Sequence, residues 1–359
     1  MSDNATTALM HSLLRPELLA SKAYAVAPGE GLIKLDAMEN PYGLPAALRE
    51  EWLRSLADAP LNRYPDAHPV ALVDALKAHV GLPAGIELML GNGSDELIQI
   101  LVTAVAGSQR PVMAVEPGFV MYRLLTQQLG LHFVGVPLDP DFRLDLPALL
   151  TAIAAQRPAI LFLDWPNNPS GSLFPEADLE AIIAAAPGLV VIDEAYHAFS
   201  QKTFAGRLAR HPNLLLLRTL SKEGLAGLRL GMLAGSAAWI QELDKLRLPY
   251  NINVLTQRSA AFYLRHAEVL EAQAEILRAE RERLFRAISA CGLSVWPSAA
   301  NFLLFHAPGR AAALFSGLRE GGVLIKVFTG HPRLGEYLRV TVGTPAENDR
   351  FLAVLESLL

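Results

Sequence analysis

The sequence predicts an α/β fold made of a large doubly wound sheet and a smaller α+β part. Short apolar stretches alternate with helical patterns between about residues 69 and 245, which is typical of a doubly wound sheet. After residue 290 several strands with fewer helices indicate a separate α+β unit. The stretch 254–290 is rich in Ala, Leu, Glu and Arg. We expect it to be helical for most of its length and to connect the two parts.

The individual elements follow from the spacing of apolar residues. We expect strands where short apolar runs are bounded by polar residues, and helices where apolar residues recur every three to four positions. In the first part the expected strands include 86–90, 159–163, 189–192 and 214–217, and the expected helices include 70–80, 97–106 and 179–186. In the second part we expect strands at 293–296, 301–305, 323–326 and 337–342, with helices near 310–319 and 346–358.

Three of the expected strands are followed by polar side chains that suit a binding site. Asn168 lies in the Asn/Pro/Gly turn after strand 159–163. Asp193 and Tyr196 follow the next strand, and Lys222 follows strand 214–217. Because ligands bind beyond the carboxyl ends of the strands in open α/β sheets, we expect these side chains to form one site.

Lys222 lies in the segment 219–231, Thr-Leu-Ser-Lys-Glu-Gly-Leu-Ala-Gly-Leu-Arg-Leu-Gly. An ammonium just past a core strand is partly desolvated, and such lysines shift their pKa readily and are typical of lysines that bond covalently to carbonyl groups. Arg229 supplies a fork of donors that suits a phosphate. The alternative is a surface loop with incidental charge.

A second phosphate-binding pattern is Gly-Asn-Gly-Ser-Asp-Glu at 91–96, between the strand 86–90 and a helix. Free N–H groups at a helix N-terminus bind phosphate. Gly93 allows a ligand to approach the backbone closely, and Ser94 can donate its hydroxyl. Asp95 and Glu96 suit the helix dipole but repel phosphate, so we expect their side chains to point elsewhere. The alternative is a dinucleotide-binding Rossmann motif, but Glu96 stands where its third glycine belongs.

Composition excludes several classes of protein. The 359 residues are 52% hydrophobic and 19% charged with a formal net charge of −5, which predicts two or three packed domains and no basic footprint for nucleic acid. The single cysteine, Cys291, excludes an internal disulfide and a Cys-rich metal site, and the nine histidines have no metal-ligand spacing. With no secretory signal and no apolar run long enough for a membrane, we expect a cytoplasmic protein.

Together these motifs resemble the fold-type-I aminotransferases, which use pyridoxal 5′-phosphate. The order Pro-Asn-Asn-Pro-Ser-Gly, Asp-Glu-Ala-Tyr, Thr-Leu-Ser-Lys and Gly-Leu-Arg carries the resemblance. Within them the chain resembles the histidinol-phosphate aminotransferase family, through the further segments 34–43, 62–66, 91–96 and 338–344. The matches extend from about Tyr24 to Thr344.

The resemblance implies a fold, an activity and an assembly. It implies a large mixed-sheet domain at 37–250 that binds the cofactor, a small domain at 251–359, and an N-terminal arm at 1–36 that joins the small domain. It implies transamination between L-histidinol phosphate and 2-oxoglutarate, giving imidazole acetol phosphate and L-glutamate in histidine biosynthesis, by a homodimer with shared sites. Alternatives on the same fold are an aromatic amino-acid aminotransferase or a phosphothreonine decarboxylase; a regulator that kept a cofactor fold is a distant one.

The resemblance also implies roles for single residues. Lys222 bonds to the cofactor and moves the proton, while Asp193 and Tyr196 act on the cofactor ring. The full cofactor-binding set that it implies is Tyr64 (from the neighbouring subunit), Gly93, Ser94, Asp95, Phe119, Asn168, Asp193, Tyr196, Thr219, Ser221, Lys222 and Arg229. The implied substrate-binding set is Tyr24, Asn40, Lys326 and Arg339, with Asn301 as a further candidate. No metal is expected. A packed core aromatic at Phe119 and a solvated edge-strand lysine at Lys326 remain alternatives.

Overall fold

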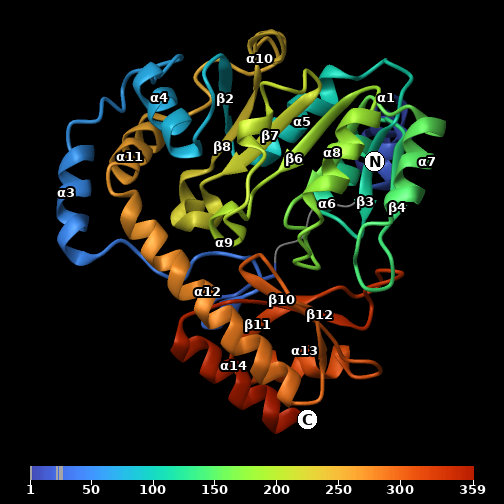
Figure 1. Ribbon diagram of the computed structural model, residues 1–359, viewed down its shortest axis with the longest axis vertical. Coiled ribbons are helices and arrows are strands. Elements are labelled where there is room, and N and C mark those ends of the chain that lie inside the picture. Colours follow the sequence, from blue (N-terminus) through green and yellow to red (C-terminus); the bar gives the residue numbers. More distant parts are fainter. Residues whose placement is uncertain (1, 22, 24–26) are drawn as a thin grey trace.

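A computed structural model describes residues 2–21, 23 and 27–359 of the chain. Two sheets with their covering helices form an upper, larger part and a lower, smaller part, and the long helix α12 (Ala267–Ala290) runs from one to the other (Figure 1). None of the helices in these described residues is long and apolar enough to cross a membrane.

The large sheet has seven strands in the order β2-β8-β7-β6-β5-β3-β4. Their bounds are β2 (Ile86–Asn92), β3 (Val112–Glu116), β4 (Phe133–Pro137), β5 (Ile160–Asp164), β6 (Leu189–Asp193), β7 (Leu214–Thr219) and β8 (Leu230–Ser236). Only β8 is antiparallel to its neighbours; the other adjacent strands are parallel. The doubly wound mixed sheet predicted from the sequence is confirmed.

Helices cover both faces of this sheet, which explains why its central strands are continuously apolar. Successive residues of β5 alternate between two cores: Leu161 and Leu163 belong to one, and Ile160 and Phe162 to the other. The first core also contains apolar residues of α4 (Val70–Val80), α7 (Leu146–Gln156) and α8 (Glu176–Ala185). The second contains residues of α5 (Ser94–Ala104), α6 (Val120–Gln128) and α10 (Ala237–Asp244).

The small sheet has five strands in the order β1-β11-β12-β10-β9, and its core lies against α13 and α14. The bounds are β1 (Ile33–Leu35), β9 (Ser294–Val295), β10 (Phe302–His306), β11 (Val323–Val327), β12 (Tyr337–Thr341), α13 (Ala311–Glu320) and α14 (Pro345–Leu358). The strand expected at 293–296 is only two residues long, because its pairing with β10 is limited to Phe305 and His306.

The helical stretch 254–290 is divided into α11 (Val254–Leu264) and α12, with a break at Arg265 and His266. The helix α11 packs against α3 (Ala46–Leu56) and α4 beside the large sheet. The helix α12 packs against β10 and α14 of the small part and also against α9 (His197–Ser200) and the turn 221–225 of the large part. Because α11 lies with the large sheet, we propose that the domain boundary lies after α11 and not at residue 251.

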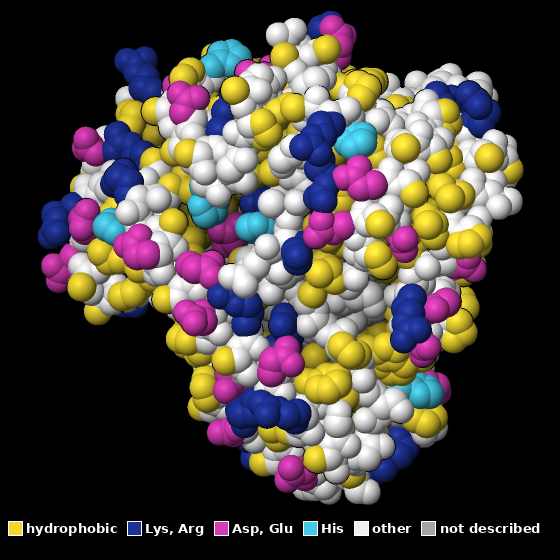
Figure 2. Space-filling view, viewed as in Figure 1, with side chains coloured by type: hydrophobic (Ala, Val, Ile, Leu, Met, Phe, Trp, Pro, Cys, Tyr) yellow, Lys and Arg dark blue, Asp and Glu magenta, His cyan; other side chains and the backbone are white. Residues whose placement is uncertain are grey.

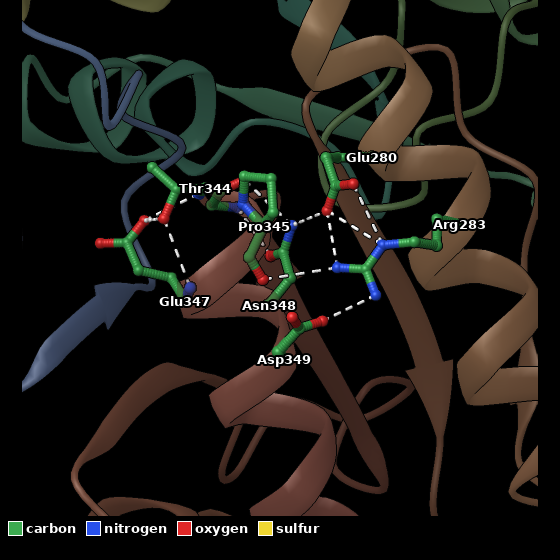
Figure 3. Close-up of polar contacts among 8 residues, drawn as sticks. Glu280, Arg283, Thr344, Pro345, Glu347, Asn348 and Asp349 are labelled. Carbon is green, nitrogen blue, oxygen red and sulfur yellow. Dashed lines mark hydrogen bonds and ion pairs between the residues drawn. The ribbon is translucent and has the colours of Figure 1, made fainter.

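Polar contacts fix the small part onto α12 (Figure 3). Arg283 of α12 forms ion pairs of 2.8 Å with Glu280 on its own helix and with Asp349 on α14.

Thr344 caps α14: its hydroxyl accepts from the Glu347 N–H at 3.3 Å, and the Glu347 carboxylate accepts from the Thr344 N–H at 2.8 Å. Such a reciprocal cap satisfies two of the donors that every helix N-terminus leaves free.

The remaining elements are the N-terminal helix α1 and several short turns and helices. They are α1 (Ser2–Leu13), α2 (Pro16–Ala20), α9 (His197–Ser200), the 3₁₀ turns η1 (Ala205–Arg207) and η3 (Ala226–Leu228), and the single π-helical turn η2 (Ser221–Leu225). On the face drawn in Figure 2, side chains of both charges are interspersed, and no continuous basic surface is visible.

Candidate functional site

The polar residues that follow β5 and β6 meet a residue of the small sheet at one edge of the large sheet. Asn168 donates from Nδ2 to the Tyr196 hydroxyl at 3.1 Å. Arg339, on β12, donates through Nη1 to Asn168 Oδ1, across 171 positions of sequence. These three side chains are buried, so their hydrogen bonds form in a medium of low dielectric constant. Such hydrogen bonds are stronger than in water and fix the orientation of the three side chains.

Asp193 is a buried carboxylate fixed by two donors. The Tyr122 hydroxyl donates to Oδ2 at 2.7 Å and the Ala195 N–H donates to Oδ1 at 3.0 Å. Burial raises the pKa of Asp193 to about 6, although the hydrogen bond from Tyr122 opposes this shift. The short helix α9 begins only at His197, with Tyr196 before it, so Asp193 does not cap a helix.

Lys222 lies in the π-helical turn that directly follows β7. Its Nζ donates to the backbone oxygen of Ala37 at 3.2 Å. Burial lowers the pKa of Lys222 to about 8, and the nearby Arg339 guanidinium contributes in the same direction. A neutral amine is therefore accessible near physiological pH, which a nucleophilic lysine requires.

The turn that carries Lys222 is held from outside by two contacts to Glu223. Asn40 donates from Nδ2 to the Glu223 backbone oxygen at 3.0 Å, and His79 Nε2 lies 3.0 Å from a Glu223 carboxylate oxygen. The contact with Glu223 raises the pKa of His79. The Asn40 side chain also bonds to Gln273 and to the Tyr42 N–H, so its contacts support the lysine turn, and its substrate role stays a prediction.

The side chain of Arg229 packs directly against Gly93, in the glycine-rich turn after β2. Gly93 has φ +84°, and a Cβ placed on it would lie 2.5 Å from Arg229 Nη2. Arg229 forms an exposed ion pair of 3.2 Å with Asp95. Glu96 points elsewhere as expected, since its carboxylate accepts from the Asn92 N–H and from Asn251. The same expectation for Asp95 is wrong, because its carboxylate pairs with Arg229.

The hydroxyls of Thr219, at the end of β7, and of Ser221, in the lysine turn, bond to each other. Thr219 Oγ1 donates to Ser221 Oγ at 2.9 Å and accepts from the Ser221 N–H at 3.1 Å. The strand β8 passes so close that a Cβ on Gly231 would lie 2.5 Å from the Ser94 backbone nitrogen. Ser94 is the first residue of α5, so its backbone N–H group has no partner within the helix.

A cavity of about 940 Å³ opens between the two sheets. Phe119, Tyr122, Asn168, Lys326 and Arg339 are among the residues that line it. Lys326 and Arg339 are direct partners on the adjacent strands β11 and β12, and burial followed by the charge of Arg339 lowers the pKa of Lys326. The wall thus carries two cations on neighbouring strands. Since β11 lies inside its sheet, Lys326 is not an edge-strand lysine.

Several of the predicted residues lie apart from this network. Tyr64 is 80% exposed and stacks on Tyr250, with ring centroids 4.5 Å apart. Phe119 contacts Tyr122 edge to face at 5.5 Å. Asn301 is buried and donates to the Met38 backbone oxygen at 3.0 Å. Tyr24 lies outside the described residues.

Two buried residues of the site were not among those singled out from the sequence, Tyr122 and Asp164. Tyr122 lies on α6, and its position in sequence gives no sign that its hydroxyl reaches Asp193. The sequence does contain a signal for Asp164: it is the polar residue that ends strand β5, just as Asp193 ends β6. No group of His, Cys, Asp and Glu side chains among the residues that the structure describes can hold a metal ion.

Comparisons with known proteins agree with this geometry. The aminotransferase class I and II family matches residues 30–355. The chain belongs to the class I and II aminotransferases. Histidinol-phosphate aminotransferase 2 of Nitrosococcus oceani is 51% identical over 347 residues, 96% of each chain. Histidinol-phosphate aminotransferase 1 of Burkholderia lata is 51% identical over 350 residues, 97% of this chain and 98% of that protein.

The fold of this aminotransferase is also found in solved structures. Histidinol-phosphate aminotransferase from Sinorhizobium meliloti, in complex with pyridoxal-5′-phosphate, has a TM-score of 0.84 and 26% sequence identity, covering 97% of both chains. The family resemblance inferred from the motifs is therefore confirmed, together with the fold class. The Rossmann alternative is excluded.

Proposed function

We propose that this chain transfers an amino group between L-histidinol phosphate and 2-oxoglutarate with pyridoxal 5′-phosphate as cofactor, giving imidazole acetol phosphate and L-glutamate in histidine biosynthesis. The observation that carries the proposal is the placement of Lys222. Its amine lies just past the end of β7 and donates to the Ala37 backbone oxygen at 3.2 Å, and burial with the charge of Arg339 lowers its pKa to about 8. The relatives named histidinol-phosphate aminotransferase support the choice of substrate.

The residues present fit the cofactor. The absence of a side chain at Gly93 lets Arg229 approach the backbone of this turn, and backbone N–H groups together with Thr219 and Ser221 suit a phosphate there. Asp193 offers a buried carboxylate, which suits the protonated ring nitrogen. Asn168 and Tyr196 offer donors for the ring hydroxyl oxygen. The cavity between the sheets is lined by Asn168 and Arg339, so a substrate in it would lie beside one of these cofactor-binding candidates.

Each side chain then has a defined task. When bound, pyridoxal phosphate supplies an electron-withdrawing ring that stabilises negative charge on the carbon next to the amine. Asp193 holds a proton on the ring nitrogen by its charge. Lys222 accepts and returns a proton at Nζ, which its lowered pKa favours. Arg339 and Lys326 orient the anionic end of the substrate through charge-assisted hydrogen bonds.

The substrate assignment is tested by changing the two cations of the cavity wall. We expect Lys326→Ala to lower kcat/KM for histidinol phosphate about ten- to hundred-fold and to affect glutamate less, because a phosphate uses both cations whereas a carboxylate needs only one. Arg339→Ala should lower kcat/KM in both half-reactions. The measurement is single-turnover kinetics of each half-reaction, with Lys34→Ala on the neighbouring strand β1 as a control.

Equal losses for both substrates in Lys326→Ala would show that Lys326 does not bind the phosphate. A parent enzyme that uses aromatic amino acids as well as histidinol phosphate would favour the aromatic aminotransferase. Release of carbon dioxide from phosphothreonine would favour the decarboxylase.

We also propose that the enzyme is a cytoplasmic homodimer in which Tyr64 reaches the partner's site. Support comes from the exposed apolar side chains around the Tyr64–Tyr250 stack, including Leu61 and Leu248, which are more than two-thirds exposed in the single chain. Exposed apolar patches of this kind mark interaction surfaces.

Mixing two inactive variants tests the shared site. We expect Lys222→Ala and Tyr64→Ala subunits to regain activity when combined, because one site of each hybrid dimer then carries neither change. At full exchange half of the dimers are hybrids and each has one intact site, so about a quarter of the parent activity is the upper limit. Native mass spectrometry measures the exchange. Complete exchange without recovered activity would mean that Tyr64 acts within its own chain.

A further inference from the structure

A second carboxylate lies beside Asp193. Asp164 ends β5 as Asp193 ends β6, and the two residues are direct partners in the parallel pairing of these strands. Partners in adjacent parallel strands project their side chains on the same face, about 4.8 Å apart. Asp164 is 3% exposed and Asp193 is 4% exposed. Two buried carboxylates therefore share one face at the edge of the sheet.

The two carboxylates are held by different donors. Asp193 accepts from Tyr122 and from the Ala195 N–H. Asp164 accepts from Asn167 Nδ2 at 3.0 Å and from the Asn168 N–H at 2.7 Å. Both donors to Asp164 thus belong to the turn that carries Asn168.

This turn is fixed further through Asn167. Its Nδ2 also donates to the Pro117 backbone oxygen at 3.2 Å, and its Oδ1 accepts from the Ser170 hydroxyl at 2.5 Å. Asn168 in turn reaches Tyr196 and Arg339. A displacement of Asp164 would therefore be transmitted through Asn168 to a tyrosine and to an arginine of the cavity.

We propose that Asp164 is a positioning residue for the cofactor: it holds the Asn168 turn, and its charge adds to that of Asp193 beside the protonated cofactor ring. This inference rests on the function proposed above. Asp164 acts through Asn168 and through its electrostatic field, and it needs no contact with the substrate.

The charge of Asp164 affects the pKa of neighbouring groups, and this effect can be measured. Burial, with a smaller contribution from the charge of Asp193, raises the pKa of Asp164 to about 7. The hydroxyls of Tyr122 and Tyr196 also interact with Asp164; their pKa values are raised, so they stay neutral. The charged group nearest in this network is Arg339, which bonds to Asn168. Above about pH 7 Asp164 and Asp193 are both anions. A pair of buried anions favours a cation beside it, so in this pH range the removal of one anion lowers the pKa of cationic groups nearby.

Asp164→Asn tests both parts of the proposal. An amide has only one acceptor oxygen, so its NH₂ group must face either the Asn168 N–H or the Asn167 amide, both of which are donors. We expect the dissociation constant of pyridoxal phosphate to rise about tenfold. We expect the pH at which the absorption spectrum of the bound cofactor changes to move to lower values. Asp74→Asn, on the exposed side of α4, serves as the control and should leave both quantities unchanged.

Asp164→Glu separates charge from geometry. It keeps the anion but displaces it, so cofactor binding should weaken while the spectral midpoint stays near that of the parent. This comparison decides the case even when Asp164→Asn destabilises the protein, which urea unfolding without cofactor measures. A midpoint in Asp164→Glu that shifts as far as in Asp164→Asn overturns the electrostatic role.

Two other results overturn the inference in distinguishable ways. A parent protein that does not bind pyridoxal phosphate in equilibrium dialysis overturns both this inference and the proposed function. A parent that binds it, together with an Asp164→Asn variant that has the same dissociation constant and spectral midpoint, overturns the role of Asp164 alone.

Discussion

Lys222→Ala is expected to abolish almost all turnover while the protein stays folded and still binds its cofactor. The substitution removes the buried amine that follows β7 and whose pKa is lowered to about 8. Loss of positioned proton transfer alone lowers the rate about 10²–10⁴-fold. Gly93 and Arg229, which are proposed to bind the cofactor phosphate, are unchanged. Cofactor affinity should therefore fall much less than kcat.

The chemistry at Lys222 can be followed without an activity assay. Borohydride reduction of the parent enzyme should fix the cofactor to Lys222, and peptide mapping identifies the modified residue. An adduct on Lys34, Lys77, Lys202, Lys245 or Lys326 would contradict the assignment. Lys245→Ala, at an exposed ion pair on α10, is a matched control and should behave as the parent does.

The pH dependence of this reaction has a defined sign. Only the neutral amine is a nucleophile, and burial lowers the pKa of Lys222 to about 8. In protein freed of cofactor, the rate at which pyridoxal phosphate becomes covalently attached should rise with pH and level off above about 8. An unperturbed lysine would continue to gain reactivity to about pH 10.

Asp193→Asn is expected to have the second largest effect. The amide preserves the shape, and the Tyr122 hydroxyl can rotate to accept from its NH₂ group, so the fold should persist. The charge that holds the proton on the cofactor ring is lost. We expect kcat to fall about 10²–10³-fold, as when other preorganised electrostatic groups are removed from an active site. Cofactor affinity should fall only about tenfold, because the phosphate contacts remain.

The comparison of kcat with the cofactor dissociation constant decides this case. Equal losses in both would mean that Asp193 contributes to binding and not to the electronic properties of the ring. Nearly full activity in Asp193→Asn would place the partner of the ring nitrogen elsewhere, and Asp164 would then be the next carboxylate to examine. Asp74→Asn again controls for loss of a carboxylate remote from the site.

The sequence alone predicted the central strands and the residues that follow them. Short apolar runs such as 189–192 indicate strands buried on both faces, and the polar residues that follow each run mark the end of the strand. Asp193, Tyr196, Asn168 and Lys222 were therefore recognisable as neighbours of strand ends. Helix 70–80 was predicted with the bounds that α4 has, because its apolar spacing is regular and Gly81 ends it in a left-handed conformation.

Tertiary structure decided which of these residues meet and what supports them. Arg339 reaches Asn168 only because the small sheet folds against the large one, and Tyr122 reaches Asp193 from a helix on one face of the large sheet. The pairing of Asp164 with Asp193 depends on strand register, which local sequence does not encode. The lowered pKa of Lys222 depends on burial by segments distant in the sequence. Local patterns thus determined the chemical groups of this protein, and long-range packing determined their distances and their charge states.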